Sequence, residues 1–269
     1  MAKYTFQNSK KGLRQLFIEK LGGDIRYATI SKTKTGKYFV SITTDFEVKK
    51  ERISDNQIGI DLGIKDFVVI SNGEKHNLLI KEDSRLKFLH KRLSKKAKGS
   101  NKSKVRLKLA KKYEKIENKK QDFQHKLSDK LCKENKLIAI EDLNIKGMVK
   151  NHYLAKSISN QSWYSFITKL EYKSKRYGGK IEKTNRFYPS SKTCSKCGYI
   201  NEDLGLKDRQ WNCPNCKSSL DRDVNASKNI LAQVQRELNI KCGGDHRVKP
   251  VELSSVDEAM KQEATRSLA

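Results

Sequence analysis

The sequence predicts an α/β fold with an inserted four-cysteine ribbon. Three observations predict it: short apolar strands alternate with helical segments, two C-x-x-C pairs stand fifteen residues apart, and acidic residues interrupt or directly follow apolar strand segments. A chain of 269 residues is long enough for one large domain or two modest domains with a buried core.

The charge balance indicates a polyanionic partner. The chain has 58 Lys and Arg residues against 31 Asp and Glu residues, a formal net charge of +27. Closely spaced phosphates reward many such contacts through counterion release, so nucleic acid is the expected polyanion and an anionic membrane is the main alternative. The sequence contains no apolar run near about 18 residues, no secretion signal and no lipidation motif. We therefore expect a cytoplasmic, nucleic-acid-associated protein without a membrane partner.

The first predicted elements are strands. Residues 24–49 alternate apolar and polar around a Lys-Thr-Gly turn, which is typical of a β-hairpin. From residue 57 to residue 80, the segments IGIDLGI, FVVISNG and KHNLLI are short strand candidates separated by Lys-Asp and Asn-Gly turn signals. This pattern predicts an antiparallel meander.

A lysine-rich helical hairpin is expected near residues 82–136. Apolar residues recur there mostly at three-, four- and seven-residue steps, as in a long amphipathic helix: Val105, Leu109, Tyr113, Ile116, Phe123, Leu127 and Leu131. The preceding SKKAKGSNKSK has the composition of a flexible turn and predicts a basic tip. Residues 81–120 carry seventeen Lys or Arg against four acids, a surface suited to a nucleic-acid backbone, with a solvated helical face as the alternative.

The remaining elements complete an alternating order. KLIAIEDLNI is an apolar strand that ends in carboxylates, SWYSFITKLEYKSKRYGG is a helix closed by Gly-Gly, and KIEKTN is a short strand. After the cysteines, DRDVNASKNILAQVQREL opens a final helix with an acidic first turn. We interpret this order as an α/β core of the RNase H type, although periodicity alone does not name that fold.

Four cysteines predict a structural zinc site. Cys194, Cys197, Cys213 and Cys216 have the paired spacing of zinc ribbons. Each C-x-x-C turn can present two thiolates to one tetrahedral ion. Because four thiolates leave no open coordination position, this zinc is expected to be structural and not to activate water. Two unrelated pairs, or a redox pair, are the alternatives, and Cys132 is expected to be a buried side chain in a helix.

Acidic residues in apolar strands indicate a second kind of metal site. Asp61 interrupts the strand GIDLG, Glu141 follows directly on LIAI, and Asp221 and Asp223 stand at the start of the final helix. A carboxylate in an apolar strand is costly unless it is paired or binds a metal. Mg²⁺ ions held by a few carboxylates commonly cleave phosphodiesters. Each acid taken singly has an alternative role. Asp61 could end a strand, Glu141 could pair with a lysine, and Asp223 could serve the start of the final helix.

Five motifs, taken in order, resemble one family. GIDLG, IEDLNI, FYPSSKT leading into CSKCG, CPNC and LDRDVNASKNI are similar, over about residues 24–253, to the TnpB (OrfB) proteins of insertion sequences, relatives of type V CRISPR effectors. The resemblance implies a RuvC-like nuclease domain of the RNase H fold that cuts DNA chosen by a guide RNA. Carried over by position, Asp61, Glu141 and Asp223 are its catalytic, Mg²⁺-binding residues. Mn²⁺ is the alternative cation, and Asp221 is the alternative third ligand.

The resemblance also implies an organisation of the chain. Residues 1–56 supply part of a β-barrel wedge, 57–185 the RuvC-like core with its basic hairpin, 186–219 the zinc ribbon, 220–240 the final core helix and 241–269 a flexible tail. In the family, a first wedge strand and a helical recognition region precede the point at which this sequence begins. We therefore expect either that the chain is a natural or engineered truncation, or that this portion is supplied by a separate polypeptide or a second protein copy, or is dispensed with.

The predicted function is that of an RNA-guided, Mg²⁺-dependent DNA endonuclease of a mobile element, with guide RNA and target DNA as partners. In such systems guide pairing reads the sequence and the protein grips phosphates. A guide-RNA- or DNA-binding protein without cleavage is the alternative, because of the expected missing portion. A DNA-joining transposase is suggested only by the mobile-element resemblance. We expect zinc to act indirectly, by fixing the entry to the helix that carries Asp223.

Overall fold

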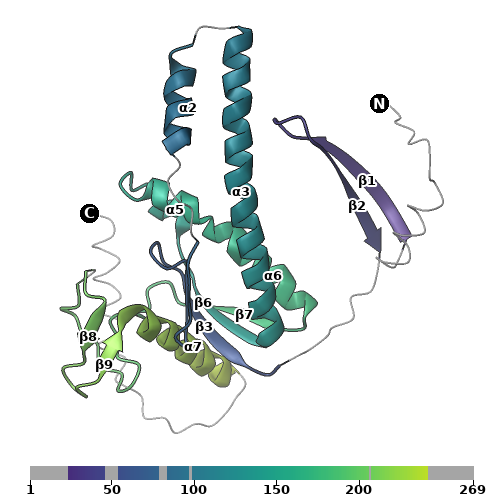
Figure 1. Ribbon diagram of the computed structural model, residues 1–269. Helices are drawn as coiled ribbons and strands as arrows, with labels where there is room; N and C mark the ends of the chain where they lie inside the picture. The colour runs from purple at the N-terminus through teal and green to yellow at the C-terminus, as the bar shows by residue number, and fades with distance from the viewer. Residues whose placement is uncertain (1–23, 46–53, 79–83, 97–98, 206, 242–269) are drawn as a thin grey trace. The chain divides into compact units, whose positions relative to one another are not determined.

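The computed structural model describes residues 24–45, 54–78, 84–96, 99–205 and 207–241 (Figure 1). The beginning of the predicted wedge and nearly all of the predicted tail lie outside the described residues. The chain forms two compact units, and the smaller consists of residues 1–49 and 80–119. The larger consists of residues 50–79 and 120–269.

The smaller unit contains a β-hairpin and a helical hairpin. β1 (Asp24–Lys32) pairs antiparallel with β2 (Tyr38–Asp45), which confirms the predicted strand pair. α2 (Ser84–Ser94) packs against the first part of α3 (Ser100–Glu134), with Leu89, Val105 and Leu109 at the centre of the contact. The apolar spacing of the sequence therefore predicted the inner face of the helical hairpin correctly.

A five-stranded sheet organises the larger unit, in the order β5-β4-β3-β6-β7. The strands are β3 (Gln57–Asp61), β4 (Val68–Ile70), β5 (Lys75–His76), β6 (Leu137–Glu141) and β7 (Lys180–Thr184). β3, β4 and β5 form the predicted antiparallel meander, and β6 runs parallel to both β3 and β7. This order and pairing are those of an RNase H-like fold, so the predicted fold class is confirmed.

Helices cover both faces of the central sheet (Figure 1). On one face, Ile138 and Ile140 of β6 pack with the second part of α3 and with α6 (Trp163–Arg176) in the main core. On the other face, Leu137 and Ala139 pack against α7 (Arg222–Lys241). The two sets alternate because successive side chains of a strand point to opposite faces. A run of apolar residues is required for a strand that is covered on both sides.

Connecting segments add elements that the sequence pattern did not predict. α4 (Ile145–Met148) and α5 (Ala155–Gln161) follow β6, and the side chain of Asn144 caps α4. α6, which the sequence did predict, ends at Arg176, and Gly178 follows the C-cap residue with a φ of 73°, as expected for a helix closed by glycine. β8 (Gln210–Asn212) and β9 (Ser219–Asp221) form a small antiparallel sheet before α7. None of the helices in the described ranges has the length and apolar character needed to cross a bilayer.

Candidate functional site

Two of the predicted acidic residues end adjacent parallel strands. Asp61 is the last residue of β3, and Glu141 is the last residue of β6. In the parallel pairing of these strands, Ile60 lies opposite Ile140. The next residues, Asp61 and Glu141, are therefore cross-strand neighbours on one face of the sheet. That face is the one covered by α7, because Gly59, two residues before Asp61, lies against that helix.

Gly59 allows α7 to approach this face closely. A Cβ atom at Gly59 would lie 1.9 Å from the carbonyl oxygen of Ser227 and 3.0 Å from the Cβ of Leu231, so the helix backbone occupies the space of a side chain. Asp61 lies about 6.6 Å further along the strand. Asp223 lies about 6 Å from Ser227 toward the start of the helix. The N-terminal turn of α7 thus lies near the end of β3, where the charge of Asp223 acts on Asp61.

The pKa of Asp61 reflects a crowded acidic site. Burial, and then the negative charges of Glu141 and Asp223, raise the pKa of Asp61 from 3.8 to about 7, although the charge of Arg222 acts in the opposite direction. A buried carboxylate such as Asp61, with two further acids acting on it, is costly to hold ionised without a cation. Their oxygen atoms are the ligands that hard divalent cations prefer. The residue types present are therefore those that Mg²⁺ or Mn²⁺ prefers, although their ligand atoms are not gathered as closely as those of the four cysteines.

Asp221 and Asp223 have different partners. One oxygen of Asp221 accepts the backbone N–H groups of Asp223 and Val224, each at 3.1 Å, and the other accepts the Nζ of Lys75 at 2.7 Å. Although burial acts in the opposite direction, the hydrogen bonds from Lys75 and from these N–H groups hold the pKa of Asp221 below its ordinary value. Asp221 therefore caps α7, and Asp223 is the acid whose charge acts on Asp61.

Arg209 is a functional candidate that the sequence analysis missed. Its Nη1 donates to both carboxylate oxygens of Asp223 at 3.2 Å, and its side chain is 52% exposed. The backbone N–H of Arg222 donates to the Arg209 carbonyl at 2.8 Å, which holds this arginine beside the start of α7. Among the described residues, the four cysteines, and not the three carboxylates, have ligand atoms gathered closely enough to hold a metal ion as they stand.

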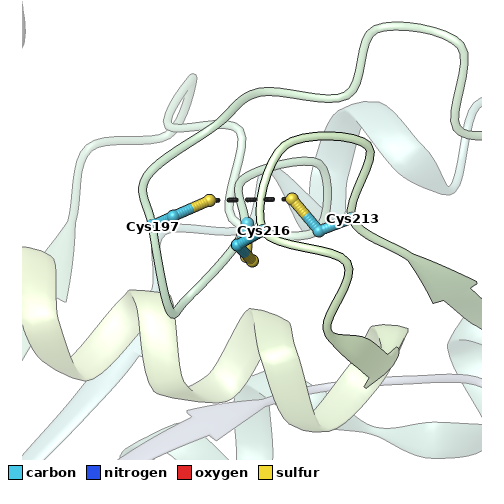
Figure 2. A group of neighbouring side chains, drawn as sticks. Cys197, Cys213 and Cys216 are labelled. Atoms are coloured by element: carbon cyan, nitrogen blue, oxygen red, sulfur yellow. Dashed lines mark hydrogen bonds between the residues drawn. The ribbon is translucent and has the colours of Figure 1, made fainter.

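The four cysteines have the dimensions of a tetrathiolate metal site. Their sulfur atoms all lie within 4.8 Å of one another. Cys194 and Cys216 are 3.7 Å apart, and Cys197 and Cys213 are 3.6 Å apart. Figure 2 shows the side chains of Cys197 and Cys213 pointing toward one another from their two turns. Thiolates at about 2.3 Å from a tetrahedral Zn²⁺ would stand about 3.8 Å apart, so the cluster fits zinc.

The two C-x-x-C turns have the same backbone geometry. In each, the first cysteine donates its N–H to the carbonyl five residues later, at 2.8 Å and 2.9 Å. In each, the residue after the second cysteine donates to the carbonyl of the first cysteine at 2.9 Å. That residue is Gly198 in the first turn, with a φ of 79°, and Lys217 in the second, with a φ of 58°. A left-handed lysine costs about 1–2 kcal/mol, so the second turn holds Lys217 in an unfavourable conformation.

Buried asparagines connect the first cysteine turn to α7. The Oδ1 of Asn225 accepts the N–H of Ser195 at 2.9 Å, and its Nδ2 donates to the carbonyl of Thr193 at 2.6 Å. Asn229, one helical turn later, donates to the same carbonyl at 2.6 Å. Both asparagines are buried, and their partners flank Cys194. The Cys194 turn is therefore hydrogen-bonded directly to α7, the helix that carries Asp223.

The basic helical hairpin carries a continuous row of lysines on one face. The row consists of exposed lysines on α3 at three- and four-residue steps: Lys104, Lys108, Lys111, Lys115 and Lys119. It extends over about 22 Å of the helix. None of the five forms an ion pair with a carboxylate in the part of the chain that the structure describes. Phosphates of a polyanion can therefore pair with the row without breaking an ion pair, although the charge of Lys111 acts on Glu114.

Two family models match consecutive parts of the chain. A model described as "Probable transposase", OrfB_IS605, matches residues 38–152, and a model described as "Cas12f1-like, TNB domain" matches residues 163–230. The chain belongs to the TnpB (OrfB) family. The resemblance found from its motifs is thereby confirmed.

Curated relatives of this TnpB-family chain carry related names. A Streptomyces pristinaespiralis protein named "Putative RNA-guided DNA endonuclease" is 38% identical over 217 residues, which are 78% of this chain and 53% of the relative. The mimivirus protein named "TnpB-like protein L79" is 30% identical over 218 residues, 73% of this chain and 41% of the relative. The chain thus spans about half the length of the curated relatives that it matches.

Similar chains are also found among solved structures. A chain in a cryo-EM structure of a CRISPR-Cas12f ternary complex has 20% sequence identity and a TM-score of 0.47. The match covers 83% of this chain and 49% of that chain.

Sequence reasoning found the cysteines and the acids of the TnpB-family chain but missed the residues that arrange them. Gly59 had a signal, because a glycine inside an apolar strand often marks a close backbone approach. No local sequence feature distinguishes Arg209 and Lys75, since they are two among many basic residues. Cys132 is buried in α3, as predicted, and burial raises the pKa of its thiol to about 12.

Proposed function

We propose that the chain acts as an RNA-guided, divalent-cation-dependent DNA endonuclease, with Asp61, Glu141 and Asp223 as its catalytic carboxylates. The observation that carries this proposal is the placement of Asp61 and Glu141 at the ends of paired parallel strands, with α7 packed closely on the same face. Burial and the charges of Glu141 and Asp223 raise the pKa of Asp61, which supports the proposal. The motifs that resemble the family contain these three acids, and the two family models span the segments in which they lie. The names of the curated relatives support the reaction class.

The three carboxylates would hold Mg²⁺, with Mn²⁺ as a substitute. When bound, the cation supplies an activated water and stabilises the leaving oxygen of a phosphodiester. Asp61 and Glu141 offer oxygens from rigid strand ends, and Asp223 offers its oxygens from the first turn of α7. Arg209 is exposed beside Asp223, so its guanidinium can donate to a phosphate oxygen of the substrate.

The four-cysteine site would hold a structural zinc ion. Four thiolates leave no coordination position for water, so zinc would act through the fold. The hydrogen bonds from Asn225 and Asn229 to Thr193 support this role, because they connect the Cys194 turn to α7. Loss of zinc is therefore expected to loosen the start of the helix that carries Asp223.

Guide RNA and target DNA are the proposed partners of the basic surfaces. The lysine row on α3 would pair with phosphates of either strand of a guide–target duplex, whereas base pairing by the guide would select the sequence. Substituting Lys111 by glutamine should reduce the dependence of log affinity on log salt by about one unit. An unchanged salt dependence would show that the lysine row does not contact the phosphates.

Purification and sequencing of the bound RNA, followed by a cleavage assay, test the proposal. The RNA should end in a segment that matches DNA, and a DNA duplex carrying that match should be cut in Mg²⁺ by the wild-type protein. Asp61→Ala should abolish cutting, whereas Asp142→Asn should not, because Asp142 is paired with Arg186 at 2.5 Å. Cutting that survives Asp61→Ala would refute the assignment of the site.

One observation favours a second candidate function. Arg209 donates to both oxygens of Asp223, and the three carboxylates are not gathered as closely as the cysteines. A protein that binds guide RNA or DNA without cleaving it would be compatible with this arrangement. Tight, salt-sensitive binding of the sequenced RNA, with no cutting in Mg²⁺ or Mn²⁺, would favour this second function.

A further inference from the structure

Asp221 uses its two carboxylate oxygens on different parts of the fold. One oxygen holds the N–H groups of Asp223 and Val224 in the first turn of α7. The other accepts the Nζ of Lys75 at 2.7 Å, and Lys75 belongs to β5, the edge strand of the central sheet. One side chain therefore connects the ribbon strand β9, the start of α7 and the edge of the sheet.

We infer that Lys75 and Asp221 are positioning residues, which fix the first turn of α7 and hold Asp223 toward the end of β3. The inference rests on the proposed function, since that proposal assigns Asp223 to the cation site. It also assigns Asp221 a role different from that of a metal ligand, although Asp221 lies only two residues from Asp223.

The hydrogen bonds carry this distinction. Asp221 holds the backbone of Asp223 itself, because the Asp223 N–H is one of its three donors, at 3.1 Å. All three donors converge on one carboxylate, so a cation at Asp221 would have to displace them. The side chain of Asp223 has a separate partner, Arg209, on the side of the ribbon. The first turn of α7 is thus held from the sheet through Lys75 and from the ribbon through Arg209.

The Lys75–Asp221 pair is suited to this role by its partial burial. The two side chains are 33% and 32% exposed, so the pair is less screened than an ion pair on the open surface. Partner groups of this kind around metal ligands commonly change metal affinity by about 10- to 100-fold when they are removed. The expected effect of losing Lys75 is therefore measurable.

Titration of the full, zinc-loaded chain with Mn²⁺ tests the inference, because positioning and simple electrostatics predict opposite signs. Lys75→Met removes a positive charge near the acids, so electrostatics alone would raise the Mn²⁺ affinity. If Lys75 positions α7, the affinity should instead fall roughly tenfold. Lys75→Arg should restore it, since arginine can also donate to Asp221. Lys228→Met, the same change at an exposed position of α7, is the matched control and should bind Mn²⁺ as the wild type does.

Hydrogen exchange of the amides of Asp223 and Val224 provides a readout that does not depend on metal. These amides should exchange faster in Lys75→Met and in Asp221→Ala than in the wild-type protein. An Mn²⁺ affinity that is unchanged or raised in Lys75→Met, or exchange that matches the wild type, would overturn the inference. If the wild-type protein binds no Mn²⁺, the proposed cation site fails, and the exchange experiment alone then decides whether Lys75 holds α7.

Discussion

Replacing Gly59 by alanine is expected to disturb the candidate site without touching any of its acids. The added Cβ would lie 1.9 Å from the carbonyl oxygen of Ser227, in the backbone of α7. A helix backbone cannot turn aside as a flexible side chain can. The helix must therefore move away from β3, and Asp223 must move with it, because it lies one helical turn before Ser227.

The size of the effect follows from the contact distance. Non-bonded carbon and oxygen atoms need well over 3 Å, so α7 has to shift by about 1 Å or more. Overpacking of this kind costs about 1–3 kcal/mol of folding free energy, which the reduced chain entropy of the unfolded alanine variant offsets by up to about 1 kcal/mol. A misplacement of about 1 Å at a catalytic group lowers the rate roughly 100-fold. The variant should therefore lose far more cleavage activity than stability.

Urea unfolding and guided DNA cleavage measure the two effects separately. Gly36→Ala is the control, because its added Cβ meets nothing within 4 Å and only its φ of 90° is unfavourable. The control should lose some stability through backbone strain and keep its cleavage rate. If Gly59→Ala has the stability and the cleavage rate of the wild type, the close packing of α7 on β3 does not position Asp223, and this part of the account is wrong.

Three further predictions concern the acids and the ribbon. In cation-free protein, the raised pKa of Asp61 means that the folded state binds its proton more tightly than the unfolded state, so this group destabilises the fold as pH rises toward and through about 7. Urea titrations should show the stability advantage of Asp61→Asn over the wild type growing by about 2 kcal/mol between about pH 5.5 and pH 8; a constant difference would contradict the shift. Cys213→Ser should release zinc, speed the hydrogen exchange of the first turns of α7 and reduce Mg²⁺-dependent cleavage, whereas unchanged cleavage would make the ribbon a spacer or a nucleic-acid clamp. Lys217→Gly should stabilise the zinc-loaded ribbon by about 0.5–1 kcal/mol in thermal unfolding, because glycine removes the left-handed strain, and a destabilised variant would show that the lysine side chain makes a larger contribution.

The sequence contained enough information to predict the sheet and the four-cysteine cluster. The apolar runs around Asp61 and before Glu141 are short and bounded by turn signals, so they predicted strands, and the structure has both acids at strand ends. The cysteine spacing predicted a single cluster, and the sulfur distances confirm it. These features depend on local pattern and on the two-residue period of a strand, which are visible in one sequence.

The residues that arrange the site depend on contacts between distant segments. Lys75 and Asp221 are 146 residues apart, and nothing in their local sequence selects one lysine from the many in this chain. The same holds for the buried Asn225, whose partners belong to the cysteine turn. The different partners of Asp221 and Asp223 also required tertiary structure, because both stand at a helix start and only the hydrogen bonds show that Asp221 caps α7.

The central claim is that Asp61, Glu141 and Asp223 together hold the cation on which cleavage depends. Calorimetric titration of zinc-loaded protein with Mn²⁺ tests it most directly, with Asp61→Asn, Glu141→Gln and Asp223→Asn beside the matched control Asp142→Asn. The account predicts that each of the three site variants loses at least about 10-fold in affinity, and that the control binds as the wild type does. Wild-type affinity in any of the three site variants, or an equal loss in Asp142→Asn, would contradict it.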